Sequence, residues 1–357
     1  MTVLRAAVSP SPFPFIPAPM IRNPFSHLAA VTALALAIAA APAIAQDTTA
    51  APTSRDSARS SKPAADTVEP PASHRAVDLT VGGVGVSIGN SRRVTGIRIN
   101  AVDHQVEQVN GLNLTLWVPR RNPELVVNGA AVGLVGPRAR RITGIGLGGL
   151  GVVTSEQMNG LGVGGLLVLS QNQINGIAAG GLAAVAEQRL RGIALGGLAA
   201  VGDHGIDGIA AGGIVSLAEG NVNGITAGGL IAITEGRLTG ASLSSLVSFV
   251  DGEVRGVNAS GVFTFTRGTA RGVSASAGVV AGDTLIGLAV AGLYARSREL
   301  RGISVASWND VRGMQRGIAI GFYNYARTIR GVQLGLLNYV RSNPRGLRLL
   351  PIFNTRF

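Results

Sequence analysis

The sequence predicts an all-β protein built as a tandem-repeat β-solenoid, similar in plan to a parallel β-helix. Glycine recurs every sixteen residues from Gly144 to Gly272, and a short fixed period is typical of a repeat architecture. Branched aliphatic residues alternate with small ones in short patches, which favours strands. The density of glycine, 51 residues in 357, disfavours helices.

Each unit is numbered here from its glycine at position 0. Position +1 is aliphatic in nearly every unit, and positions +3, +6, +9 and +14 are apolar in most units. This pattern predicts columns of Leu, Ile and Val stacked inside the coils, small residues on flat outer surfaces and arginines at corners. Leu198 occupies +6, so we expect Leu198→Asp to place a charge in the core and unfold the protein.

Three features favour the solenoid. Turn signals occur twice per unit, as at Glu219-Gly220 and Asn223-Gly224. The unit shortens from sixteen to fifteen or fourteen residues after Gly272 without losing its pattern, whereas one extra residue in a straight strand would move every later side chain to the other side. Both sides of the segment 176–186 are apolar or small, whereas a wide barrel needs a polar lumen.

An antiparallel outer-membrane β-barrel, with one strand and one turn per unit, is the alternative. Asn-Gly pairs at 159–160, 175–176 and 223–224 are strong hairpin signals. Tyrosines at 323, 325 and 339 would suit an aromatic girdle. Phe357 resembles the C-terminal signature of such barrels.

The first 45 residues are predicted to be a secretory signal peptide. Arg22 precedes an apolar run at 27–41, and Ala43-Ile44-Ala45 is a small-x-small cleavage site. Met20 is a candidate for the true start, since residues 1–19 contain five prolines and do not resemble a signal. The run is too short and too rich in alanine for a transmembrane anchor.

The rest of the chain divides by composition. Residues 46–75 are rich in Ala, Pro, Ser and Thr, which predicts a disordered linker. Residues 76–143 carry degenerate units that start the array, residues 144–345 are the regular repeats of 14–16 residues, and residues 346–357 are a C-terminal cap. Atypical terminal units are common in stacked arrays, because they close an open end.

The last units carry a more specific motif. Gly331-Val-Gln-Leu-Gly-Leu-Leu-Asn338 is followed by Pro351-Ile-Phe-Asn-Thr-Arg-Phe357. This pattern resembles bacterial surface-repeat proteins of spirochaetes and Gram-negative groups, over roughly residues 80–357. The central units depart from it, with Ala or Gly in place of Gln and Asn. The resemblance implies a surface or envelope location and no established chemistry.

The formal charge is +12, and Lys62 is the only lysine. Arginines gather near the C-terminus, and these six are the candidate contacts for anionic lipid, lipopolysaccharide or a surface polyanion: Arg327, Arg330, Arg341, Arg345, Arg348 and Arg356. Solvated turn residues are the equally weighted alternative. Nucleic acid is not expected as a partner, because an exported chain with few aromatic residues lacks stacking platforms.

No catalytic, cofactor or metal site is predicted. Cysteine is absent, which excludes disulfides and thiolate ligands, and the four histidines are expected at the surface without converging ligands. Carboxylates recur at +11, and in stacked coils they would form a row of like charges, interpreted as solvated corners rather than calcium ligands. They are Glu187, Asp203, Glu219, Glu235 and Asp251.

The sequence therefore predicts an exported, non-catalytic repeat protein of a Gram-negative envelope, structural or adhesive, with no cofactor. A barrel acting as a channel or anchor is the second hypothesis. An enzyme built on a solenoid is the third, and it would need a carboxylate cluster on long loops, which the regular spacing of the units does not provide.

Overall fold

The computed structural model describes residues 76–82, 84–117 and 124–356. These residues belong to the second of two compact units, Pro70–Phe357, and this unit alone is described below. The predicted signal peptide and linker, residues 1–45 and 46–75, lie outside the described residues.

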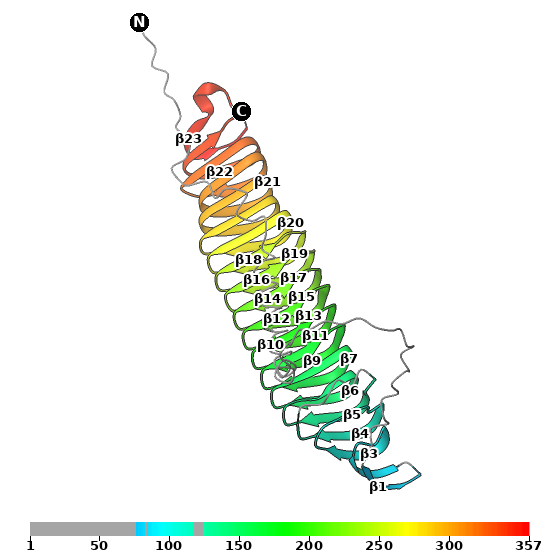
Figure 1. Ribbon diagram of the computed structural model, residues 1–357. Helices are drawn as coiled ribbons and strands as arrows, with labels where there is room; N and C mark the ends of the chain where they lie inside the picture. Colours follow the sequence, from blue (N-terminus) through cyan, green and yellow to red (C-terminus); the bar gives the residue numbers. More distant parts are fainter. Residues whose placement is uncertain (1–75, 83, 118–123, 357) are drawn as a thin grey trace, which may run out of the picture. The chain divides into compact units, whose positions relative to one another are not determined.

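The described chain is almost entirely β-strand (Figure 1). The first seven strands are β1 (Ala76–Val81), β2 (Val84–Gly89), β3 (Arg93–Asn100), β4 (Gln108–Thr115), β5 (Val126–Gly133), β6 (Arg138–Gly148) and β7 (Gly151–Gly164). The long strands of the central repeats are β9 (Gln173–Gly180), β11 (Arg189–Gly196), β13 (Gly205–Gly212), β15 (Asn221–Gly228), β17 (Leu238–Ser244) and β19 (Val254–Ser260). The short strands between them are β8 (Leu167–Ser170), β10 (Ala183–Ala186), β12 (Ala199–Gly202), β14 (Val215–Ala218), β16 (Ile231–Thr234) and β18 (Val247–Val250). The C-terminal coils contain β20 (Phe263–Ser276), β21 (Val279–Ile320), β22 (Tyr323–Val340), a 3-10 turn at Arg345–Leu347 and β23 (Leu349–Asn354).

The strands stack in parallel, with each unit pairing to the next in register. Gly192 of β11 faces Gly176 of β9 on one side and Gly208 of β13 on the other. The short strands form a second parallel file, in which Val185 faces Leu169 and Val201. The chain is therefore a β-solenoid of about 15 turns, which confirms the predicted fold class and contradicts the barrel alternative.

Each sixteen-residue coil has a long strand, a bend, a short strand and a second bend. The repeat glycine lies within the long strand, where Gly176 has φ = 128°, a conformation that other residues rarely adopt. A Cβ at this position would collide with the carbonyl oxygen of Gly160 in the preceding coil. The Asn175-Gly176 pair thus lies inside β9, and its interpretation as a hairpin turn is wrong.

The core of each coil is narrow and holds one large aliphatic side chain. The predicted +14 column is confirmed, because its members are at most 1% exposed: Met158, Ile174, Leu190, Ile206, Val222, Leu238 and Val254. Small side chains at +2, +8 and +10 fill the remaining interior, as Ala178, Ala184 and Ala186 do in one coil. The +9 column is confirmed in part, since Val185 is buried and Phe249 is only half-buried.

The +1, +3 and +6 columns were predicted to lie inside, and this prediction is wrong. Ile177 at +1 and Leu195 at +3 are each 44% exposed, and Leu198 at +6 is 46% exposed. Successive side chains of a strand point to opposite sides, so the side chains at +1 and +3 point outward when the one at +2 points into the core. The side chain at +6 lies at the surface because it follows the bend. The interior is too narrow for three further large side chains per coil, since small residues already fill it.

Two other rows define the outside of the solenoid. The residues three positions and one position before each repeat glycine are polar in nearly every unit, and we term this surface the ionic strip. On it, Arg255 and Arg271 both form ion pairs with Glu253, at 3.2 and 3.3 Å. The residues at +1, +3 and +6 after each glycine form what we term the apolar flank. Polar and apolar surfaces are thus segregated along the whole stack.

Antiparallel strands close both ends of the parallel stack. β1 pairs antiparallel with β2, and β23 pairs antiparallel with β22; the two pairs lie at opposite ends of the rod (Figure 1). Near the C-terminal end the motif asparagines form an internal ladder, in which Asn309 donates to Asn324 and Asn324 donates to Asn338, each at 2.8 Å. Among the described residues, no helix is long and apolar enough to cross a bilayer.

Candidate binding site

Aromatic residues collect on the outside of β21 and β22. Trp308 faces Tyr323 across the parallel ladder, with ring centroids 5.3 Å apart and planes nearly perpendicular. Tyr294 packs against the other edge of Trp308 in the same edge-to-face manner, at 5.8 Å. Edge-to-face pairs of this kind are favourable beyond their buried area, so three coils share one aromatic row.

A second aromatic pair lies beside this row. Tyr325 and Tyr339 stack face to face with their centroids 5.6 Å apart and an interplanar angle of 7°. Tyr325 also faces Asp310 across the ladder. The tyrosines that would have formed a girdle in a barrel therefore pack into one cluster on the solenoid.

Asp310 is held in place by two donors. The Tyr294 hydroxyl donates to its Oδ2 at 2.7 Å, and Nε of Arg312 donates to the same oxygen at 3.1 Å. Burial, together with this hydrogen bond, raises the pKa of Tyr294 far above its ordinary value, so the phenol stays protonated and remains a donor. Asp310 is thus a positioned carboxylate, and its charge is shared with Arg312.

These residues enclose a cleft of about 420 Å³. Its walls come from three successive coils and comprise Trp308, Asp310, Arg312, Tyr323, Tyr325, Arg327 and Arg341. Three guanidinium groups and one carboxylate give the lining a formal charge of +2, which is 3 − 1. Guanidinium groups bind phosphate and carboxylate in bidentate fashion, and the rings supply flat apolar walls. The arrangement is suited to holding an anionic ligand by contact.

Two of the six arginines predicted from the sequence, Arg327 and Arg341, line this cleft. Arg330 faces Arg316 on the ionic strip, and Arg345 is exposed in the 3-10 turn. Arg348 donates Nε to the Asn343 carbonyl at 2.9 Å. Arg356 lies just after β23. Within the described residues, none of the six forms an ion pair with a carboxylate side chain.

Sequence reasoning missed Arg312, Trp308 and Asp310. The signal was present in their spacing, because Trp308-x-Asp310-x-Arg312 and Tyr323-x-Tyr325-x-Arg327 have the same period-two pattern fifteen residues apart. Alternate residues of a strand share one side, and neighbouring coils bring equivalent positions together. Two matching triplets one coil apart therefore predict a shared cluster.

The carboxylates at +11 stack in the bends between short and long strands. Burial raises the pKa of Asp203 to about 6, with further contributions from Glu219 and Glu187 in the adjacent coils. Burial likewise raises the pKa of Glu187 and of Glu235. The predicted row of like charges is thus present, and it ends where Arg267 pairs with Asp251 at 3.0 Å. In the part of the chain that the structure describes, no group of three or more His, Asp or Glu is placed to hold a metal ion.

No protein-family model matches the chain, and searches of curated proteins and of solved structures gave no significant match.

Proposed function

We propose that this protein is a non-catalytic scaffold of a Gram-negative cell envelope, structural or adhesive, which attaches to an anionic surface polymer through the C-terminal cleft. The observation that carries the proposal is the cleft itself, where Arg327 and Arg341 flank aromatic walls and form no ion pair with a carboxylate among the described residues.

The charge distribution around the cleft supports an anionic partner. From Arg301 to Arg356 the sequence has nine arginines, while Asp310 is the only carboxylate side chain. A local excess of one sign raises the concentration and the association rate of ligands of opposite sign. The arginines of the ionic strip contribute less, because carboxylates such as Glu253 neutralise them.

The solenoid supports a role in display or attachment. A stack of about 15 coils with a rise of about 4.8 Å per coil would be roughly 70 Å long, so the cleft would stand well away from the N-terminal end. The predicted signal peptide and the resemblance to bacterial surface-repeat proteins both point to export. The polymer that fits best is a phosphorylated or carboxylated saccharide of the lipopolysaccharide type.

Binding of the full chain to purified lipopolysaccharide tests this function. Arg327→Gln with Arg341→Gln should weaken binding at least tenfold, and added salt should weaken the wild-type complex, because exposed charges are screened. The matched control is Arg255→Gln with Arg271→Gln, which removes the same charge from a strip where Glu253 already pairs with both residues.

An unchanged affinity in the cleft variant would refute the proposal. Equal weakening in both double variants would also refute it, because net charge rather than the cleft would then account for binding. Absence of binding by the wild-type chain at micromolar concentrations would refute the choice of ligand class.

A further inference from the structure

The apolar flank has no charged residue anywhere in the repeats. Positions +1 to +6 are uncharged in every unit from Gly144 to the unit that begins at Gly331. The exposed flank residues include Ile177, Leu195, Leu198, Ile225 and Leu230, each 40% exposed or more. Monomeric soluble proteins rarely expose a continuous apolar patch beyond a few hundred Å², and larger patches mark interaction surfaces.

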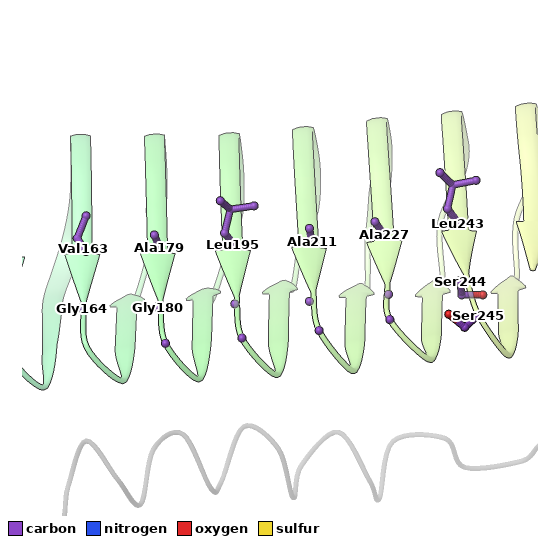
Figure 2. Close-up of a pocket in the computed structure, with 17 residues that line it drawn as sticks. Val163, Gly164, Ala179, Gly180, Leu195, Ala211, Ala227, Leu243, Ser244 and Ser245 are labelled. Atoms are coloured by element: carbon purple, nitrogen blue, oxygen red, sulfur yellow. The ribbon is translucent and has the colours of Figure 1, made fainter.

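A groove runs along this flank over six coils. It has a volume of about 780 Å³ and lies over the +3, +4 and +5 positions, from Val163 and Gly164 to Leu243, Ser244 and Ser245. Figure 2 shows the six +3 residues in a row on neighbouring long strands, with the bends directly beyond them. The groove exists because +4 and +5 are mostly paired glycines, so no side chain covers the backbone there.

In five of the six coils both positions are glycine, and the backbone there leaves no room for a side chain, which keeps the groove open. A Cβ at Gly180 would collide with the Ala183 carbonyl oxygen, and one at Gly181 would collide with the Gly165 carbonyl oxygen. The residue that follows, at +6, forms an apolar ridge along the edge of the groove. The ridge comprises Leu166, Leu182, Leu198, Ile214, Leu230 and Leu246.

The groove and the ridge have the same repeat, one element per coil of about 4.8 Å. A partner that fills the groove along its length must present apolar side chains at this same spacing. The +6 side chains on the ridge of a second copy have this spacing. A two-fold axis would place the ridge of each copy in the groove of the other, as a self-complementary interface requires. Interdigitated side chains from stacked strands make dry, close contacts of this kind.

We propose that two copies of this chain pair through their apolar flanks, with the +6 ridge of each copy seated in the glycine groove of the other. Ten coils from Gly144 to Gly287, at about 4.8 Å each and with a flank roughly 14 Å wide, give about 700 Å² per copy. The six coils of the groove contribute about 400 Å² of this, and a standard interface buries ~800 Å² per partner. No charge loses water in such a contact, since none lies on the flank, and the ionic strip provides a polar rim.

Light scattering of the full chain in buffer without detergent tests the pairing. The wild-type chain should have about twice the monomer mass of 36.3 kDa. Leu198→Asp with Leu230→Asp places two carboxylates on the ridge of each copy, and it should give monomers with unchanged circular dichroism. The matched control, Gln173→Glu with Thr239→Asp, adds the same charge on the ionic strip and should leave the dimer intact.

Cross-linking through an introduced cysteine gives a second measurement, which does not require the aspartate variant of the ridge to fold. The chain has no cysteine, so Ala211→Cys introduces one thiol into the groove and Thr239→Cys introduces one into the ionic strip. In the paired form each groove thiol faces the ridge of the other copy, so a short bismaleimide that spans the two adjacent grooves should link two copies of the groove variant and leave the strip variant unlinked.

A monodisperse wild-type monomer would overturn the proposal, as would a dimer that persists in the ridge variant. Equal cross-linking by the two cysteine variants would also overturn it, because the contact would then be nonspecific. A monomer that binds neutral phosphatidylcholine vesicles, and loses this binding in the ridge variant, would assign the flank to a lipid surface instead.

Discussion

Arg98 and Asp103 form an ion pair inside the N-terminal coils, with Nη1 of Arg98 donating to Oδ1 of Asp103 at 2.5 Å and both side chains almost completely buried. Arg98 occupies the +2 position, where the central coils carry alanine or a small polar residue. Asn113 and Thr115 donate to the second carboxylate oxygen at 3.0 and 2.6 Å. A charged network therefore fills the interior where the apolar core begins.

Replacing Arg98 should destabilise the N-terminal coils strongly. Arg98→Ala leaves Asp103 buried without its counter-charge, and breaking one side of a buried pair costs about 3–5 kcal/mol. Hydrogen exchange of the amides in β3 and β4 should accelerate accordingly, while the central strands change little. Arg93→Ala is the control, because its pair with Glu107 is exposed and should contribute about 1 kcal/mol or less. Comparable protection in the two variants would contradict the importance of the buried pair.

Substitution by aspartate should prevent folding at one leucine and be tolerated at another one eight residues away. Leu190→Asp places a carboxylate in the fully buried +14 column, so we expect the chain not to fold, because an unpaired buried charge is too costly. Leu198→Asp should fold, since Leu198 is nearly half exposed. Circular dichroism and urea unfolding of each variant give the comparison. Loss of folding in Leu198→Asp would show that the +6 row lies in the core after all.

A methyl group on a repeat glycine should disrupt the stacking of two coils. Gly192 has φ = 116°, and an added Cβ would meet the Gly176 carbonyl oxygen, so Gly192→Ala should cost at least about 2 kcal/mol. Gly346→Ala is a matched control, because no atom lies within 4 Å of its added Cβ. Thermal unfolding distinguishes the two, and equal melting temperatures would mean that the backbone accommodates the methyl group.

The carboxylate row should make stability depend on pH. The pKa of Asp203 is raised to about 6 from 3.8, so the folded protein binds this proton more tightly than the unfolded chain does. Stability from this group is present below pH 3.8 and is lost as pH rises towards 6. Asp203→Asn should therefore raise the melting temperature at pH 8 and flatten its change between pH 4 and 7. A wild-type profile with no fall over this range would contradict the raised pKa of Asp203, which burial causes first and the neighbouring carboxylates second.

The repeat period and the predicted strands were sufficient to predict a solenoid, but they did not show which side chains point into its core. The +14 column was placed correctly because polar neighbours flank it, as Arg189 and Arg191 flank Leu190. The +6 leucines were predicted wrongly because hydrophobic side chains also cover the outside of this narrow coil, where Leu198 is 46% exposed. The small residues at +2, +8 and +10 were the better indicator, since a narrow interior selects for volume.

The candidate site was predicted in part for a related reason. Arg327 and Arg341 were expected to contact anions from charge alone, and both line the cleft. Trp308 and Asp310 were not expected, because their proximity depends on the register between coils. A linear pattern of charge does not contain that register, so it cannot separate the arginines of the cleft from those elsewhere near the C-terminus.

The length of the solenoid between its two antiparallel end strands depends on the number of central units. Each central strand pairs only with its equivalents in the preceding and following coils, as β11 does with β9 and β13. Recombination between near-identical units, such as loss of Gly176–Arg191, would shorten the span by about 4.8 Å and rejoin the same surfaces. The number of central units therefore sets the distance between the N-terminal coils and the arginine-rich C-terminal coils, and removing one unit changes neither end strand.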